Sequence, residues 1–391
     1  MAVELSQSVR ESLREYFAGR EGEVLSLVRA LVEAESPSGD VEGNRAVVSL
    51  LTEVVRRINV ETEVTTDFAP GYGSHLLIRA FGDTDRQDLP ATLILGHTDT
   101  VHPRGSIRAR PWREEDGRVY APGIFDMKAN CALTLEALRA CATLKLRPSR
   151  PVVLLLTCDE EVGSHSGRAL VEREARRAAQ VLVLEPSAPD GRAKTARKGT
   201  GMFTLRTTGR AAHAGLDPEK GASAILEMAR QIERLHALGD VARGVTVNVG
   251  VVSGGTRSNV VAAEAQAEID VRFSTMEDAL RLEEAILQLR PFDERVRISV
   301  GGGINRPPLE RSDAVVALYE HARQIAAAFD FELGETSVGG ASDGNFAAAV
   351  GATVLDGLGV EGDGAHATHE HIVKSDLARR GALLAALIAT L

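Results

Sequence analysis

Three short segments that are apolar on both faces constrain the fold more than any other feature of the chain. They are residues 92–95, 152–156 and 181–184. Such segments are typical of strands in a parallel sheet that helices cover on both sides, whereas strands with one face in water alternate apolar and polar residues. Segments 130–145 and 167–179, which lie between them, have helical spacing. The order of strands and helices therefore predicts an α/β fold with a helix-covered, mostly parallel sheet.

The flanking segments extend this domain on both sides. Helical patterns lie at 4–34, 44–57, 314–329 and 375–391, an alternating strand at 60–64, and another buried strand at 353–355. We therefore expect the first domain to be completed by the C-terminal part of the chain.

A different pattern interrupts this domain from about residue 200. Its strands alternate apolar and polar residues, as in 263–273, so one face of their sheet meets solvent. The expected elements are a strand at 202–208, a helix at 221–238, strands at 245–252 and 263–273, a helix at 276–289 and a strand at 296–300. This order predicts an inserted α+β domain with β-α-β-β-α-β topology.

Charge and composition exclude several kinds of partner. Lys+Arg 45 against Asp+Glu 55 gives a net charge of −10, and the basic residues form no stripe, so we expect no nucleic-acid partner. The apolar runs are far shorter than the roughly 20 residues that cross a bilayer, so we expect no membrane partner. The three cysteines, Cys131, Cys141 and Cys158, lack C-x-x-C spacing, and the N-terminus is charged. These features predict a cytoplasmic protein without disulfides or an export signal.

Side chains of the types that bind metals follow each predicted buried strand. The candidates are His97, Asp99, Asp126, Glu160, Glu161, Glu185 and His366. Ligands of open α/β sheets bind at the carboxyl ends of the strands, so we expect these side chains to converge.

Carboxylates brought to one place resist ionisation, because like charges repel and burial removes water. A divalent cation removes that cost. Histidine mixed with Asp and Glu, without thiolate, suits zinc, manganese or cobalt. So many ligands favour two ions that share one carboxylate, and such centres are typical of hydrolases.

Two positions predict how the centre is arranged. Asp99 lies two residues after His97 in one extended segment, so its carboxylate is expected to accept the second ring N–H of His97. The adjacent Glu160 and Glu161 are expected to face opposite ways in an extended segment. One of them then holds a metal and the other is left to act as a base.

Two motifs that point to other enzyme classes lack their structural context. Residues 340–344 fit G-x-S-x-G, but residues 334–338 do not have the pattern of the buried strand that a nucleophile elbow requires. The glycines at 301–303 lack the strand-to-helix context of a phosphate loop. We therefore expect neither a serine hydrolase nor a nucleotide-dependent enzyme.

Taken in order, these motifs resemble those of the M20 family of dinuclear zinc peptidases and deacylases. The matching runs are Gly-His-Thr-Asp-Thr-Val, Pro-Gly-Ile-Phe-Asp-Met-Lys, Cys-Asp-Glu-Glu-Val-Gly-Ser, Leu-Glu-Pro-Ser and Gly-Arg-Ala-Ala-His-Ala-Gly. The resemblance covers nearly the whole chain and is closest to glutamate carboxypeptidases of the carboxypeptidase G2 type. It implies a catalytic zinc-binding domain of residues 1–199 and 307–391, interrupted by a lid and dimerisation domain of residues 200–306.

The resemblance also implies roles at the metal centre. Two zinc ions are implied, with cobalt or manganese as alternatives, and Asp126 would bridge them. His97 and Glu185 would bind one ion, and Glu161 and His366 the other. Glu160 would be the general base, and a cis peptide bond would join Asp126 to Met127.

The last ligand has more than one candidate, because His366, His369 and His371 lie close together in the sequence. We choose His366, since it follows a glycine-containing turn and Glu370 stands four residues after it, as in the family's pattern.

The resemblance also implies three functional residues in the lid, and a fourth, Gly340, that follows it in the sequence. His213 would reach the partner subunit's active site and stabilise the oxyanion. Arg272 would bind the terminal carboxylate of the substrate. Asn259 and Gly340 match further substrate contacts.

The sequence therefore predicts a homodimeric zinc hydrolase that cleaves a C-terminal amino acid, first of all glutamate, from a peptide or N-acyl group. One alternative is an N-acyl-amino-acid deacylase. The other is a non-catalytic binder of amino acids or peptides, which the base Glu160 disfavours, since a binder has no use for a base.

Overall fold

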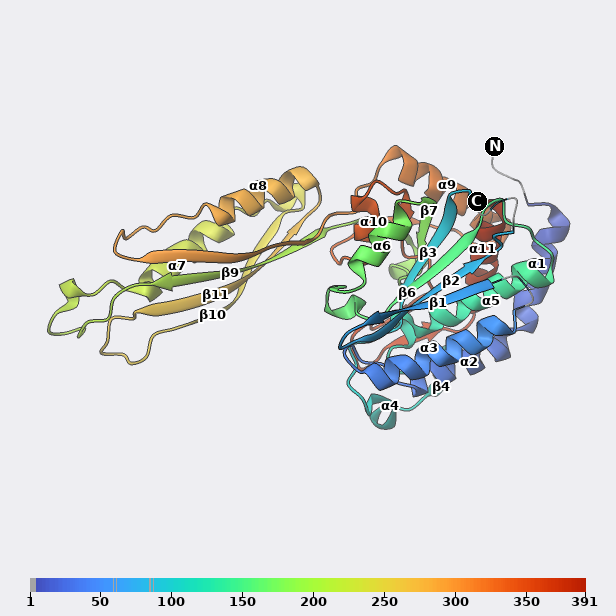
Figure 1. Cartoon of the computed structure of the whole chain (residues 1–391), viewed down its shortest axis with the longest axis horizontal. Helices are drawn as coiled ribbons and strands as arrows, with labels where there is room; N and C mark the ends of the chain where they lie inside the picture. Colours follow the sequence, from blue (N-terminus) through green and yellow to red (C-terminus); the bar gives the residue numbers. More distant parts are fainter. Residues whose placement is uncertain (1–4, 59, 61, 84–85, 87) are drawn as a thin grey trace. The chain divides into compact units, whose positions relative to one another are not determined.

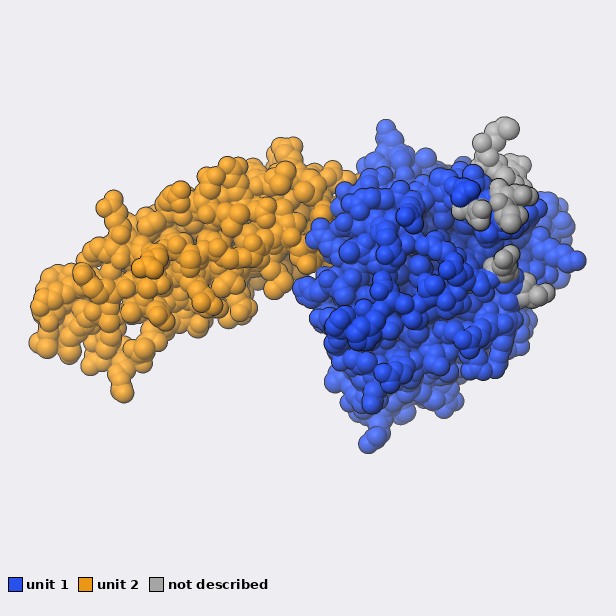
Figure 2. All heavy atoms as spheres, viewed as in Figure 1, with its two compact units in different colours: residues 1–196, 311–338, 342–391 blue, residues 197–310, 339–341 orange. Residues whose placement is uncertain are grey.

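The chain divides into two compact units (Figure 2). The computed structural model describes residues 5–58, 60, 62–83, 86 and 88–391. Unit 1 comprises Met1–Ala196, Arg311–Val338 and Ser342–Leu391, and unit 2 comprises Arg197–Glu310 and Gly339–Ala341.

The sheet of unit 1 has the strand order β1-β2-β6-β3-β7-β14. Its parallel strands are β3 (Ala91–His97), β6 (Val152–Thr157), β7 (Ala178–Val183) and β14 (Val354–Leu355). The antiparallel hairpin of β1 (Thr62–Ala69) and β2 (Gly73–Ala80) extends the sheet beside β6. Every residue of β6 is buried, which explains why its sequence is apolar on both faces. The predicted α/β class with a mostly parallel sheet is confirmed.

Helices cover the sheet of unit 1 on both faces (Figure 1). On one face lie α3 (Val41–Arg56), α5 (Ala129–Thr143) and α11 (Asp376–Thr390), with α1 (Gln7–Gly19) and α2 (Glu21–Glu33) packed against them. On the other lie α6 (Arg168–Ala175) and α10 (Asp343–Ala349), while α9 (Asp313–Ala328) packs on β14 and α11. The chain passes from β3 to β6 through α5 and then back across β3 to β7 through α6. Right-handed crossovers that run in opposite directions place these helices on opposite faces, so the strand ends between them are open to a ligand.

Short elements that sequence patterns did not predict complete unit 1. They are the sheet of β15 (Gly362–Asp363), β16 (His371–Val373), β5 (Arg118–Tyr120) and β4 (Arg113–Glu115), the pair β8 (Ala193–Arg197) and β13 (Glu335–Val338), and the short helices α4 (Ser106–Ala109), η1 (Ile124–Lys128), η2 (Glu160–Val162) and η3 (Pro189–Gly191). Strands of two to five residues carry too little alternation to be recognised.

Unit 2 is a four-stranded antiparallel sheet with the strand order β10-β11-β9-β12. Along the chain its main elements are β9 (Gly199–Thr208), α7 (Ala224–His236), β10 (Thr246–Gly254), β11 (Glu264–Phe273), α8 (Met276–Leu287) and β12 (Arg297–Arg306), with the short helices η4 (Pro218–Lys220) and η5 (Val241–Arg243). Alternate residues such as Phe203, Leu205 and Ile269 are buried in a core with residues of α7 and α8. The predicted β-α-β-β-α-β order is therefore confirmed.

Within the part of the chain that the structure describes, no helix is both long enough and apolar enough to span a bilayer.

Candidate metal centre

The carboxyl end of β3 places His97 at the centre of the site. The preceding Gly96 is tightly packed: an added Cβ would lie 2.7 Å from the Cε atom of Met127 and 3.0 Å from Cδ2 of Leu156, so these side chains would have to shift. The His97 ring is buried, and its Nδ1 lies 3.0 Å from the backbone carbonyl of Asp99. A carbonyl can only accept, so Nδ1 carries the proton of a neutral ring and Nε2 presents its lone pair to the site.

Five side chains from separate segments form a connected group that includes His97, and we call them the metal cluster. They are His97, Asp126, Glu161, Glu185 and His366. His97 Nε2 lies 3.1 Å from Asp126 Oδ1 and 3.5 Å from Glu185 Oε1. His366 Nε2 lies 3.5 Å from Asp126 Oδ2 and 3.0 Å from Glu161 Oε2. Asp126 therefore directs one oxygen to each histidine.

These distances fit divalent metals. Zinc binds nitrogen and oxygen at about 2.0–2.2 Å, so two ligands of one tetrahedral ion lie about 3.4 Å apart. The other oxygen of Glu161, Oε1, is buried and has no hydrogen-bond partner among the described residues. A buried carboxylate oxygen without a donor is costly, and a cation would remove that cost. The donor set and its spacing therefore fit two ions that share Asp126.

The close approach of carboxylates and histidines in the cluster also shifts their pKa values in the absence of metal. Burial lowers the pKa of His97, but the carboxylates of Asp126, Asp99 and Glu185 outweigh it and hold the pKa well above the usual value. Asp126 and Glu161 raise the pKa of His366 to about 10. Burial, together with the charge of Asp126, raises the pKa of Glu161 despite the nearby His366. Without metal, the carboxylates therefore favour the protonated, positively charged form of both histidines, and a bound cation would supply the same positive charge.

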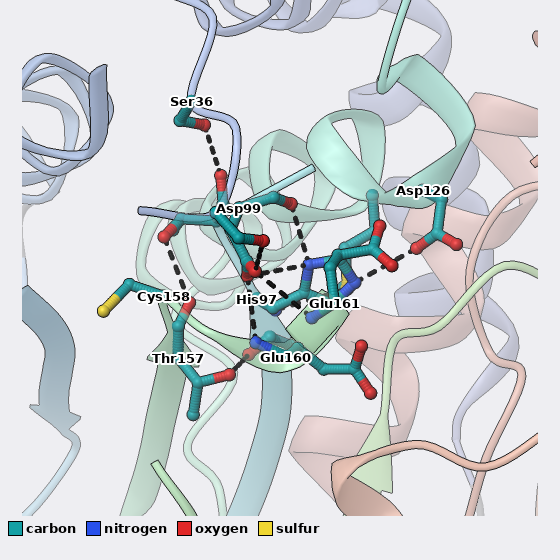
Figure 3. Close-up of polar contacts among 12 residues, drawn as sticks. Ser36, His97, Asp99, Asp126, Thr157, Cys158, Glu160 and Glu161 are labelled. Atoms are coloured by element: carbon teal, nitrogen blue, oxygen red, sulfur yellow. Dashed lines mark hydrogen bonds and ion pairs between the residues drawn. The ribbon is translucent and has the colours of Figure 1, made fainter. Parts of the chain in front are cut away.

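The turn that carries Glu160 and Glu161 differs from the sequence-based expectation. The pair lies in the 3₁₀ helix η2 rather than in an extended segment, so the reason given for their opposite directions was wrong. Their carboxylates still point in different directions (Figure 3). Ligand atoms of His97, Glu160 and Glu185 lie within 4.8 Å of one another, and those of His97, Asp126 and Glu161 do so as well. Both glutamates therefore border the same centre.

Asp99 holds this turn. Its Oδ1 accepts from the backbone N–H of Glu160 at 3.2 Å, and its Oδ2 accepts from that of Glu161 at 3.2 Å and from Ser38 Oγ at 2.6 Å. Its carboxylate is 3.5 Å from His97 Nδ1, farther than its own backbone carbonyl. The Asp99 side chain thus positions the two glutamates more directly than it positions the histidine. Sequence reasoning missed Ser38, because no motif marks it.

The turn that carries Asp126 is η1, which leads into α5. The peptide bond between Asp126 and Met127 is cis, as the resemblance implied.

The C-terminal histidines differ in their surroundings. His366 has a left-handed backbone with φ 64°, which is unusual for a residue other than glycine and is frequent at functional sites. His369 is exposed. His371 is buried in β16, where its ring packs against Tyr120 with centroids 5.0 Å apart. Of the three, His366 is the one whose ring contacts cluster carboxylates.

The candidate residues of unit 2 lie at two ends of its sheet. His213 Nδ1 accepts from the backbone N–H groups of Gly215 and Leu216, both at 3.1 Å. In the neutral ring the proton is therefore on Nε2, which can donate it. The next residue, Ala214, donates its N–H to the carbonyl of Asn259 at 3.0 Å. The loops of His213 and Asn259 are therefore neighbours.

Arg272 lies at the opposite end of that sheet, since it pairs with Thr200 of β9 whereas the His213 loop follows Thr208. At about 3.4 Å per residue, the strand between these two positions is about 27 Å long. The Arg272 guanidinium donates two hydrogen bonds to Asp270, at 2.9 and 2.8 Å. No small substrate reaches both His213 and Arg272 of one unit 2.

Gly340 accepts a hydrogen bond through its carbonyl from Arg197 Nη1 at 3.2 Å. An added Cβ would meet no atom within 4 Å there, so nothing in the structure requires glycine at this position.

The G-x-S-x-G motif has a structural role. A strand, β13, does precede it, but β13 is only partly buried in a two-stranded sheet. Ser342 is the N-cap of α10 and donates its hydroxyl to Asp356 at 2.6 Å. A serine whose hydroxyl is used in a buried cap is not a nucleophile elbow.

The α/β sheet, its antiparallel insertion and the metal cluster at the strand ends define a metallohydrolase. The sequence pattern of peptidase family M20/M25/M40 matches residues 93–390, and the chain belongs to this family.

Relatives with known activities cover most of the chain. Carboxypeptidase G2 of Pseudomonas sp. (strain RS-16) is 29% identical over 372 residues, which are 93% of this chain and 88% of that protein. Acetylornithine deacetylase of Myxococcus xanthus is 29% identical over 329 residues, 76% of this chain and 80% of that protein. The crystal structure of aminopeptidase PepT from Bacillus cereus shares the fold, with a TM-score of 0.78 at 23% identity, covering 95% of this chain and 98% of that one.

Proposed function

We propose that this enzyme is a dinuclear zinc exopeptidase that hydrolyses the amide bond of a C-terminal amino acid, with glutamate as the first candidate. The observation that carries the proposal is the position of Asp126, whose two oxygens face different histidines at 3.1 and 3.5 Å. The proposed ligands are His97, Glu185, Glu161 and His366, with Asp126 shared. Cobalt or manganese suits the same donors.

Bound ions of this kind supply a water of lowered pKa and polarise the amide carbonyl. The chain then has to move one proton. In the proposal Glu160, which borders the cluster without being one of its members, takes the proton from the attacking water and returns it to the leaving amine. Asp99 keeps Glu160 in place through the backbone N–H.

The proposal also assigns roles to unit 2. Arg272, oriented by Asp270, binds the free carboxylate of the substrate, and Asn259 and Gly340 contact the substrate. His213 donates its Nε2 proton to the oxyanion. Because His213 and Arg272 lie at opposite ends of one sheet, the proposal takes His213 from a second copy of the chain, and thus requires a homodimer that forms through unit 2.

Acetylornithine deacetylase is also 29% identical to this chain, although over 329 residues instead of the 372 of carboxypeptidase G2, and it supports an N-acyl-amino-acid deacylase as the second candidate function. The two functions share the metal cluster and differ in the group that is recognised. We further propose a cytoplasmic location, supported by three buried cysteines that are all free thiols.

Metal analysis combined with amino-acid release tests the proposal. Purified enzyme should contain two zinc ions per chain and release glutamate from N-acyl-glutamates faster than it cleaves dipeptides with a free amino group. N-acetyl-glutamate is a substrate of either activity, so N-blocked dipeptides that end in glutamate separate the two functions. Faster hydrolysis of N-acetyl-amino acids than of these dipeptides would favour the deacylase.

The Glu160→Ala variant should keep its zinc and lose turnover by about 10²–10⁴-fold. Glu53→Ala, which removes an exposed carboxylate of α3, is the matched control and should change nothing. Hydrolysis within tenfold of wild type in Glu160→Ala means that the base is another residue, and zinc binding without any hydrolysis in the wild type means that the protein is a binder.

A further inference from the structure

The carboxylate of Glu370 is buried and accepts four hydrogen bonds. Three come from the backbone of the turn that carries Asp126. Oε2 accepts from the N–H of Gly123 at 2.7 Å, and Oε1 accepts from those of Phe125 at 2.9 Å and Asp126 at 3.0 Å. The fourth comes from His102 Nε2, 2.6 Å from Oε2. Each oxygen therefore has two donors.

The hydrogen-bond partners of His102 indicate which ring nitrogen carries the hydrogen. Its Nδ1 lies 3.1 Å from Arg110 Nη2, and a guanidinium only donates, so Nδ1 is the acceptor. Nε2 then carries the hydrogen and donates it to Glu370. Arg110 also donates through Nη1 to the carbonyl of Ala367, next to the ligand His366, at 3.2 Å. Arg110, His102 and Glu370 thus form one chain of hydrogen bonds that ends on the Asp126 turn.

We propose that Glu370 is a positioning residue for Asp126, and that His102 and Arg110 orient Glu370. The inference rests on the proposed function, in which Asp126 is the shared ligand. Because Glu370 binds the backbone of the turn, the Asp126 side chain stays free to direct its two oxygens to His97 and His366. The segment 366–370 therefore supplies one ligand and positions another.

Glu370→Gln tests the proposal with almost no change of shape. Each carboxylate oxygen serves two donors, so the amide group of glutamine faces two N–H groups in either orientation. We expect zinc affinity, measured by competition with a chelator, to fall by about 10- to 100-fold. In the metal-free protein, hydrogen exchange of the amides of Gly123, Phe125 and Asp126 should become faster by a similar factor.

Glu136→Gln is the matched control. Glu136 is also a buried carboxylate of unit 1, but it accepts from Tyr16 at 2.7 Å and Arg20 at 2.9 Å instead of from the turn. It should lower stability without changing zinc affinity or the exchange of the three amides. The proposal is overturned if the zinc affinity and the exchange rates of the three amides in Glu370→Gln stay within twofold of wild type.

His102→Phe keeps the ring but removes the donor to Glu370, and it decides the question even if Glu370→Gln does not fold. This variant should lower zinc affinity and speed amide exchange by smaller factors than Glu370→Gln does. When His102→Phe and Glu370→Gln are combined, their effects should be less than additive. Unchanged amide exchange in His102→Phe overturns the orienting role. Because exchange is measured without metal, a wild type that binds no zinc would refute the proposed function and still leave the exchange result to decide the role of Glu370.

Discussion

Replacing Asp99 by asparagine tests whether its carboxylate positions the glutamate turn or the histidine. The carboxylate accepts from the N–H groups of Glu160 and Glu161, both at 3.2 Å, and from Ser38. Asparagine has the same shape but only one acceptor oxygen. The cheaper orientation keeps that oxygen toward Ser38 and Glu161 and turns the NH₂ group toward the N–H of Glu160. That N–H then loses its acceptor.

An unpaired backbone N–H in a partly buried position costs about 1–3 kcal/mol. If this whole free-energy cost is added to the activation barrier through a misplaced Glu160, kcat/KM falls about 5- to 150-fold. The tautomer of His97 should not change, because its Nδ1 faces the backbone carbonyl of Asp99, which the substitution keeps. Zinc content should therefore stay close to that of wild type.

Steady-state kinetics on the best acyl-amino-acid substrate, together with elemental analysis, measure both effects. Ser38→Ala is the control, since it removes a donor and leaves both backbone N–H groups paired; kcat/KM should fall less than fivefold. An Asp99→Asn enzyme with kcat/KM within twofold of wild type would refute the assigned role. Loss of zinc with the same variant would show that the carboxylate acts on His97 instead.

Three more outcomes follow from the geometry. Zinc uptake by the metal-free protein at pH 7 should release up to about two protons, because the two cluster histidines have raised pKa values, about 10 for His366, and zinc binds neutral imidazole. A pH indicator in dilute buffer measures the released protons. Raising the pH through 10 should remove the contribution of His366, because its imidazole is then already neutral before zinc binds. Mixing inactive His213→Ala and Glu160→Ala subunits should restore about a quarter of the wild-type activity, since half of the dimers then contain one intact site; no recovery contradicts action across subunits. Arg272→Ala should raise KM at least tenfold for substrates with a free carboxylate, because a charge-assisted bidentate contact is lost, and leave the KM of the matching amides unchanged.

The sequence predicted those parts of the fold whose pattern is long and apolar. Residues 152–156 and 181–184 were recognised as strands because both of their faces are buried, and the insertion was recognised because β11 alternates along its whole length. The strand β2 was missed, although Leu76 and Ile78 are fully buried. Its hairpin with β1 is local, but its pairing with β6 joins residues that are 80 positions apart, such as Leu76 and Leu156, and no local pattern encodes that pairing.

The chemistry of the site was predictable for a related reason. Parallel strands end at one edge of the sheet, so His97 and Glu185 had to lie near each other once their strands were recognised. The supporting contacts were not predictable. Nothing close to His102 in the sequence indicates that its ring lies 2.6 Å from Glu370. The η2 helix also escaped prediction, because the backbone N–H bonds to Asp99 set its conformation from 61 positions away.

The members of the metal cluster are spread along the chain from His97 to His366. During synthesis the ribosome releases the segment of His97 first, and the segment of His366 emerges 269 residues later. A nascent chain that has reached Glu185 therefore carries the proposed base, Glu160, and four of the five cluster members without a complete cluster. In the proposed function, hydrolysis therefore begins only after the segment of His366 has been synthesised and its imidazole has joined the metal cluster.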